Sequence, residues 1–296
     1  MPGRHVVVRT EALLRWLRIL RSLAEGYPVE SELRGWSWQF PPVRPRSYLG
    51  LSVQDAVSYC PTKRDVWLRR VAGVRVQPTQ YMRTGSAVHD VVFSVASLVR
   101  RHFNANQDFE RLSRAVGRVV ELKSRECPSE ECVKIVRSVG WLTYHTAASE
   151  WLWSGAGSLP IPATASLCEV RVDGSPVGLS GSLRVDSLPV PNVVVDIKTG
   201  RKVEAHEVSL TAYALALESA LETPVDFGLL VYVWWSGGLQ VDLRGVYIGP
   251  DLRRMFLDSR DEAIDIILSR REPPNAVECP QACPYVEVCG RENARS

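Results

Sequence analysis

The chain has 296 residues, which is enough for one sizeable hydrophobic core or for one core with a small appended module. Its content of 45% hydrophobic and 23% charged residues is that of an ordinary soluble globular protein. A net charge of +3 argues against a protein whose whole surface attracts nucleic acid, so any contact with DNA must come from a local patch.

Targeting signals are not evident in the sequence. The N-terminal segment is interrupted by Arg and Glu, so it lacks the apolar region of a signal peptide. The longest apolar run, residues 227–235, is too short to span a bilayer. We therefore expect a cytoplasmic protein. In a reducing cytosol, its seven cysteines are expected to be metal ligands or core residues rather than disulfides.

The first half of the chain is predicted to be helical. A basic helix covers residues 10 to about 24, and a proline-rich connector occupies residues 41–46. The helical pattern resumes at residue 52 and continues to about residue 153. Within it, residues 85–103 carry apolar side chains on nearly every face, which predicts a buried helix.

The second half alternates strands and helices. Period-two patterns predict three strands at residues 167–172, 179–188 and 193–198, and the short turns between them favour antiparallel pairing. A helix over residues about 203–221 precedes a strand at 227–235, and this connection permits parallel pairing. A further strand to residue 248 and a helix from 251 to about 271 complete a predicted α/β core.

The most informative residues of this core are Asp196 and Lys198. They share one face of a strand because residues two apart project to the same side, while Val195 and Ile197 point into the core. The carboxylate can hold Mg²⁺ or Mn²⁺ and the amine can orient the attacking water, which suits phosphodiester hydrolysis. An exposed ion pair on a strand is the alternative interpretation.

Further residues can complete such a site. Asp186 ends the preceding strand, so the next turn brings it beside Asp196. His89, in the apolar helix, is either a satisfied core histidine or a ligand suited to Mn²⁺. Glu169, on the first strand, is either a further ligand or a solvent-side carboxylate. Tyr213, in the following helix, either contacts a DNA strand or belongs to the helix core.

This ordered set of side chains resembles the RecB-like nuclease family, a branch of the restriction-endonuclease-like fold, over roughly residues 52–235. The resemblance implies that the divalent metal is bound by His89, Asp186, Asp196 and the Ile197 carbonyl. It also implies that Lys198 positions the nucleophilic water. The family usually has a glutamine four residues before the tyrosine, where this chain has Ser209. That departure leaves the grip on DNA and the polarity of cleavage open, but not the metal site.

The C-terminal tail holds three thiols within eleven residues, at Cys279, Cys283 and Cys289. Zinc sites and cubane clusters both favour four ligands, and Cys60 is the natural fourth because it also precedes a proline. One early cysteine with a C-terminal trio resembles the iron–sulfur subset of RecB-like nucleases, which implies a structural 4Fe–4S cluster. Zinc and a pair of disulfides are the alternatives.

The other three cysteines are expected to have no role in that cluster. Cys168 alternates with valines on the first strand, so it is predicted to be a core residue. Cys127 and Cys132 flank Pro128, and we expect two free thiols there rather than a local disulfide or a minor metal site.

A stand-alone RecB-like nuclease with four such cysteines resembles the CRISPR-associated exonucleases of the spacer-acquisition machinery, and its length is closest to the archaeal Csa-type subgroup. The resemblance implies cleavage of single-stranded DNA ends, processing of spacer precursors and association with the CRISPR integrase complex. The alternatives are a DNA-repair exonuclease outside CRISPR and a catalytically silent iron–sulfur scaffold that binds DNA ends.

The same resemblance implies a division of the chain into four parts. Residues 1–50 form an N-terminal extension, and residues 51–155 form a helical region with the first cluster cysteine and the histidine ligand. Residues 156–250 form the RecB-like core, and residues 251–296 form the last helix and the iron–sulfur module.

Overall fold

The structure is a computed structural model that describes residues 10–105, 108–153, 167–190, 192–200, 202–279 and 283–290. The α-helices are α1 (Thr10–Gly26), α2 (Val53–Val57), α3 (Arg64–Arg70), α4 (Gln80–Ala105), α5 (Phe109–Ser124), α6 (Glu130–Trp153), α7 (Ala205–Leu221) and α8 (Pro250–Ser269). The strands are β1 (Leu167–Val172), β2 (Leu183–Val190), β3 (Val193–Thr199), β4 (Phe227–Trp235) and β5 (Leu239–Tyr247).

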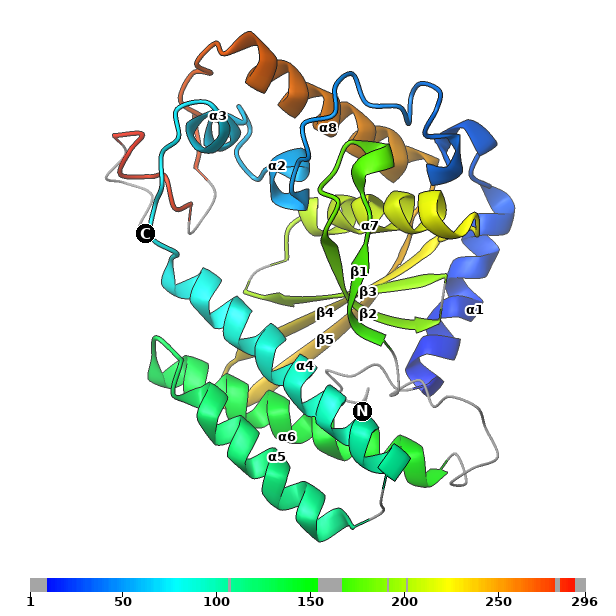
Figure 1. Cartoon of the computed structure of the whole chain (residues 1–296), viewed down its shortest axis with the longest axis vertical. Coiled ribbons are helices and arrows are strands. Elements are labelled where there is room, and N and C mark those ends of the chain that lie inside the picture. Colours follow the sequence, from blue (N-terminus) through cyan, green and yellow to red (C-terminus); the bar gives the residue numbers. More distant parts are fainter. Residues whose placement is uncertain are drawn as a thin grey trace.

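A five-stranded sheet lies between two layers of helices (Figure 1). Helices α7, α8 and the short α2 lie on one side of it, and α4 and α6, backed by α5, lie on the other. Helix α1 packs against β5. This architecture confirms the predicted α/β class with a mixed sheet. No described helix is long and apolar enough to cross a membrane.

The strands follow one another across the sheet in the order β1-β2-β3-β4-β5. The first three strands pair antiparallel and β3 pairs parallel with β4, which agrees with the pairing expected from the connections. Strand β5 returns antiparallel beside β4. The predicted start of the second strand at residue 179 is wrong. The preceding residues form a 3-10 turn (Ser175–Val177), and Leu179 instead makes an isolated bridge with Leu51, so β2 begins at Leu183.

The two faces of the sheet contribute to two hydrophobic cores. On β3, Val194 packs with the cluster formed with α7 and α8, whereas Val195 and Ile197 pack with the cluster formed with α4 and α6. This alternation follows from the pleat of a strand. It places Asp196 and Lys198 on the α7 side of the sheet.

Helix α4 has one exposed side, so the prediction of burial on nearly every face is only partly confirmed. Val88, Val91, Val95 and Val99 are buried against the neighbouring helices and the sheet. Phe93, however, is 40% exposed. Helices α5 and α6 and the sheet cover only part of the circumference of α4, so Phe93 and polar residues such as Ser86 and Asp90 remain exposed to solvent.

A buried ionic network joins α7 to α8 and to two short 3-10 turns near the N-terminus, Ser31–Leu33 and Gly35–Ser37. Arg253 donates to both carboxylate oxygens of Glu218 at 2.8 and 2.9 Å, and neither side chain has exposed surface. Arg34 donates to Glu218 at 2.8 Å and also pairs with Asp226. The backbone N–H of Gly35 donates to Glu218 at 2.8 Å. Buried charges are tolerated when they are paired and hydrogen-bonded in this way.

The expectation of free thiols at Cys127 and Cys132 is wrong, because the structure joins them in a disulfide between α5 and α6. The turn between the helices brings their Cα atoms to 5.5 Å, within the range that a disulfide requires. Cys168 lies on β1, but its side chain lies outside the described residues.

Candidate active site

The two aspartates meet because β2 and β3 are adjacent antiparallel strands. Ser187 pairs with Val195, so Asp186 lies beside Asp196 along the shared edge. The backbone N–H of Ile197 donates to Asp186 Oδ2 at 2.8 Å, which holds that carboxylate against β3. Asp186 lies within β2 rather than at its end, because the strand begins later than predicted and continues to Val190.

The histidine reaches this pair from α4, a helix far away in the sequence. A Cβ atom on Gly85 would lie 3.3 Å from Thr199 Oγ1, which shows how closely the first turns of α4 approach the end of β3. One helical turn later, His89 Nδ1 lies 3.2 Å from Asp186 Oδ1. The imidazole therefore faces a carboxylate and is 30% exposed, so it is not an enclosed core histidine.

Glu169 joins the same group. The potential ligand atoms of His89, Glu169 and Asp186 all lie within 4.8 Å of one another. Among the described residues, this trio is the one group of three or more His, Cys, Asp or Glu side chains close enough to hold a metal ion together. Glu169 has a left-handed backbone conformation with φ 54°, which is uncommon for a residue with a side chain. Its carboxylate also lies 3.4 Å from Arg184 Nη1.

Asp196 and Lys198 form a close ion pair beside this trio, with Lys198 Nζ 2.7 Å from Asp196 Oδ2. Burial and the neighbouring Asp186 raise the pKa of Asp196 to about 6, despite the opposing effect of Lys198. Burial lowers the pKa of His89, but Asp186 and Asp196 outweigh it and raise that pKa to about 9. The site thus concentrates negative charge that attracts cations.

Helix α7 covers the site from the other side. Ser209 is buried, and its hydroxyl donates to the His206 carbonyl at 2.7 Å and to Asp196 Oδ2 at 3.4 Å. The residue at the usual glutamine position therefore contacts a candidate ligand directly. Burial, followed by the charges of Asp196 and Asp186, raises the pKa of Tyr213, so the phenol is within electrostatic range of both carboxylates. Tyr213 also packs on the core, which agrees with its interpretation as a helix-core aromatic, and its contact with DNA stays a prediction.

Sequence reasoning missed three aromatic residues around Lys198. His206 shares a 3.1 Å hydrogen bond with the Tyr232 hydroxyl, and its ring meets that of Tyr59 edge-on at 5.8 Å. Burial and the nearby Lys198 charge lower the pKa of His206 to about 4, so it is neutral at pH 7. One signal was present: residues 206, 209 and 213 share a face of α7.

The four cysteines predicted to form a cluster all have free thiols and are all half-buried. Burial raises the pKa of Cys283, and the thiols of Cys279 and Cys60 act in the same direction, so these three are electrostatic neighbours. The thiol of Cys289 is a hydrogen-bond partner of Arg64, which lies four residues after Cys60. The tail and the loop before α3 therefore bring Cys60, Cys279 and Cys283 within electrostatic range of one another, and Cys289 contacts the first residue of α3, although residues 280–282 lie outside the described residues.

Comparison with known proteins decides the family. The model of the family described as CRISPR-associated exonuclease Csa1 matches residues 7–292. The chain belongs to this family. A "CRISPR-associated exonuclease Csa1" of Thermoproteus tenax is 32% identical over 278 residues, which cover 94% of this chain and 96% of the relative. Another Csa1 exonuclease, of Saccharolobus solfataricus, is 33% identical over 273 residues, covering 88% and 92%. No solved structure matches the chain.

Membership in the Csa1 family confirms the resemblance to CRISPR-associated exonucleases that the motifs indicated. Of the two nuclease functions considered from the sequence, it favours a role in CRISPR over one in DNA repair.

Proposed function

We propose that this chain is a CRISPR-associated DNA exonuclease that requires a divalent metal, and that His89, Asp186 and Asp196 bind the metal. The observation that carries the proposal is the meeting of His89, Glu169 and Asp186 within 4.8 Å, next to the Asp196–Lys198 ion pair. A helix and separate strands supply these side chains, and each of them was a candidate site residue in the sequence.

The residues present fit Mn²⁺ or Mg²⁺. Carboxylates are the preferred ligands of Mg²⁺, and an imidazole among them suits Mn²⁺. The Ile197 carbonyl lies on β3 between Asp196 and Lys198, and we propose it as a further ligand. Glu169 is within reach of the same ion. When bound, the metal would supply Lewis-acid activation of the phosphate and of water.

The other residues of the site position groups. Lys198 lies on the strand face that carries Asp196, where its ammonium would orient the attacking water and offset charge on the phosphate. Tyr213 is half-buried and within electrostatic range of both aspartates, and we propose that its ring contacts a DNA strand entering from the α7 side. Ser209 is too short to replace the amide of a glutamine, and it instead helps to hold Asp196.

We also propose that Cys60, Cys279, Cys283 and Cys289 hold a structural 4Fe–4S cluster. Four free, half-buried thiols gathered from two distant segments suit such a cluster, and thiolates are its usual ligands. The cluster would join the start of α3 to the C-terminal tail. The reaction at the acidic site needs no electron, so this role is structural.

The proposed substrate and partners rest on the resemblance to the family. We propose that the chain trims single-stranded ends of spacer precursors together with the CRISPR integrase complex. The relatives are named as CRISPR-associated exonucleases, which supports DNA ends as the substrate.

The test of the metal site is Asp196→Asn, which keeps the shape of the side chain and removes its charge. We expect Mn²⁺- or Mg²⁺-dependent cleavage of end-labelled single-stranded DNA to fall by more than about 100-fold, the upper range for removing even an outer-shell partner of a metal. Asp258→Asn, the same change at an exposed position of α8, is the control. A folded Asp196→Asn protein that cleaves at the normal rate would remove the assigned metal site, whereas an unchanged protein that cleaves no DNA with Mn²⁺ or Mg²⁺ would favour the silent scaffold.

A further inference from the structure

Helix α5 has an exposed basic face that the proposed active site does not use. Arg111, Arg114, Arg118, Leu122 and Arg125 are all exposed, and we call them the α5 stripe. They follow one another at intervals of three or four residues, so they lie along one side of the helix. The buried side of α5 consists of residues such as Leu112, Val116 and Val120. The basic face is thus the side turned away from the core.

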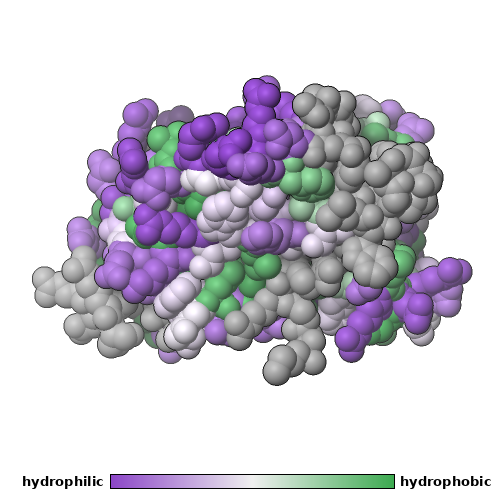
Figure 2. Space-filling view, turned by 90° about the horizontal axis from the view of Figure 1, so that it is seen from below, coloured by the Kyte–Doolittle hydropathy of each residue, from purple (hydrophilic) through white to green (hydrophobic). Residues whose placement is uncertain are grey.

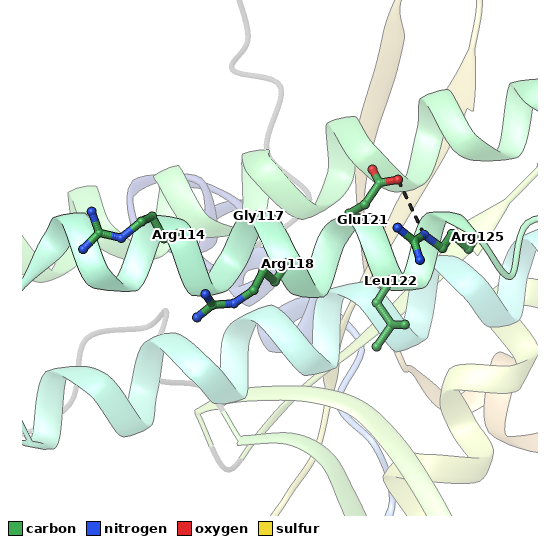
Figure 3. A pocket seen from close by; sticks show the side chains of 6 residues that line it. All are labelled: Arg114, Gly117, Arg118, Glu121, Leu122 and Arg125. Atoms are coloured by element: carbon green, nitrogen blue, oxygen red, sulfur yellow. Dashed lines mark ion pairs between the residues drawn. The ribbon is translucent and has the colours of Figure 1, made fainter.

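The stripe borders a hollow of about 640 Å³ (Figure 3). The hollow is lined by Arg114, Gly117, Arg118, Glu121, Leu122 and Arg125. Gly117 lies between two arginines and has no side chain to fill the space between them (Figure 3). Leu122 is 59% exposed and adds an apolar surface among the guanidinium groups. The hollow therefore combines positive charge with a patch that an apolar group can contact.

The positive charge of the stripe is only partly balanced. Arg114 pairs with Glu110, and Arg125 lies 3.8 Å from Glu121, which also binds Arg137 at 2.8 Å. Arg111 and Arg118 have no acidic partner within the described part of the chain. Exposed pairs of this kind contribute little to stability, so a phosphate can replace the carboxylate at small cost.

The stripe leads toward the candidate active site. Helix α5 lies beside α4 and runs in the opposite direction (Figure 1). Near its C-terminal end, Lys123 Nζ lies 3.5 Å from Asp90 Oδ2, and Asp90 is the neighbour of His89. Hydrophilic side chains cover much of the face seen from below, to which α5 and α6 belong (Figure 2).

We propose that the α5 stripe binds the sugar–phosphate backbone of a DNA strand and guides that strand to the active site; its guiding role rests on the proposed function. From Arg111 to Arg125 the helix rises about 21 Å, the length of about six nucleotide steps at the spacing of a duplex strand. Regularly spaced guanidinium groups match regularly spaced phosphates, which they bind bidentately. Leu122 is placed to contact a sugar or base.

The first test removes the two arginines that have no acidic partner. Binding of a fluorescent single-stranded oligonucleotide is measured at several salt concentrations in EDTA, so that cleavage does not interfere. In Arg111→Ala/Arg118→Ala, we expect affinity at 0.1 M salt to fall about ten-fold and the salt dependence (log K against log salt) to lose about 1.4 units of slope. Arg15→Ala/Arg18→Ala, which removes two exposed arginines of α1, is the matched control.

The second test leaves every arginine in place. Gly117→Glu puts a carboxylate into the hollow, and Gly117→Gln puts in a neutral side chain of the same size. A Cβ atom at this position would lie 3.6 Å from the nearest atom of Trp141, an ordinary contact, and both residues favour a helix over glycine. Both variants should therefore fold, and only Gly117→Glu should weaken binding.

The inference is overturned if the Arg111→Ala/Arg118→Ala variant keeps the normal salt slope, if the α1 control loses as much affinity, or if Gly117→Gln weakens binding as much as Gly117→Glu. Binding in EDTA does not depend on cleavage. Failure of the proposed function, seen as normal cleavage by Asp196→Asn (wrong site) or as no metal-dependent cleavage by the unchanged protein (no nuclease), is therefore distinguishable from failure of the stripe.

Discussion

The buried carboxylate of Glu218 is expected to be one of the most sensitive positions for stability. It accepts five hydrogen bonds: two from Arg253, one from Arg34, and one each from the backbone N–H groups of Gly35 and Val225. Replacing Glu218 with alanine removes all five acceptor contacts at once. It also leaves the Arg253 guanidinium, which has no exposed surface, with only Asp226 and backbone carbonyls as partners.

The size of the effect follows from this geometry. Removing one partner of a buried ion pair costs about 3–5 kcal/mol, because the other charge stays buried without compensation. At about 2.1 cal/mol/K of unfolding entropy per residue, such a loss corresponds in this chain to a fall in Tm of about 5–8 °C. The measurement is thermal or denaturant unfolding followed by circular dichroism. Glu222→Ala, at an exposed position just beyond α7, is the control and should change stability by less than about 0.5 kcal/mol.

Glu218→Gln adds a test of the pH dependence. Burial alone would raise the pKa of Glu218, but Arg253 and the N–H groups of Val225 and Gly35 lower it below its ordinary value of 4.5. A carboxyl with a lowered pKa stabilises the fold above its unfolded pKa, and this stabilisation is lost as pH falls through the folded value. The unchanged protein should therefore lose stability below about pH 4.5 more steeply than Glu218→Gln.

Two results would refute the reasoning. The first is a Glu218→Ala variant that unfolds at the same temperature as the Glu222→Ala control. The second is an acid-unfolding profile of Glu218→Gln that is as steep as that of the unchanged protein. Either result would show that the network contributes no net stability.

Two other substitutions test the predicted cluster and the packing of the N-terminal turns. In anaerobically purified Cys60→Ser, we expect iron and visible absorbance to be lost and stability to fall, because a link between two distant segments is opened. The control Cys168→Ser should keep its iron, and full iron in Cys60→Ser would assign the fourth ligand elsewhere. In Gly35→Ala, the new Cβ would lie 2.0 Å from the Leu215 carbonyl oxygen, so we expect the free energy of unfolding to fall by about 3 kcal/mol. The control Gly26→Ala, whose Cβ would have no neighbour within 4 Å, should lose almost none, and equal melting temperatures of the two variants would contradict the prediction.

The regular elements of the fold were predictable because their signals are local. The bounds of β1 and β4 agree with the prediction, since alternating or continuous apolar runs end at turn residues. The parallel pairing of β3 and β4 follows from the helix that connects them. The start of β2 was not predictable, because it depends on the bridge between Leu179 and Leu51, which are distant in the sequence.

The same distinction applies to the site. Strand geometry alone predicts that the side chains of Asp196 and Lys198 project to the same side of β3, and the turn between β2 and β3 brings Asp186 beside them. The position of Tyr59 could not be derived in this way. It depends on a loop in which Ser58 and Lys63 have φ values of 24° and 51°, conformations that no pattern of the sequence indicates. The disulfide between Cys127 and Cys132 was likewise hidden, because the usual chemistry of a reducing compartment argues against it.

Tyr59 and Cys60 are consecutive residues whose side chains lie near two different groups, the acidic site and the cysteines of the tail. Burial raises the pKa of the Tyr59 phenol, and the charges of Lys198 and Asp196 also act on it. The thiol of Cys60 is instead within electrostatic range of Cys283 in the tail. Because successive Cα atoms are only about 3.8 Å apart, whatever anchors the thiol also restricts where the phenol ring can lie. The thiol group and the acidic site are therefore linked through a single peptide bond, and a displacement of the Cys60 backbone would also displace that of Tyr59.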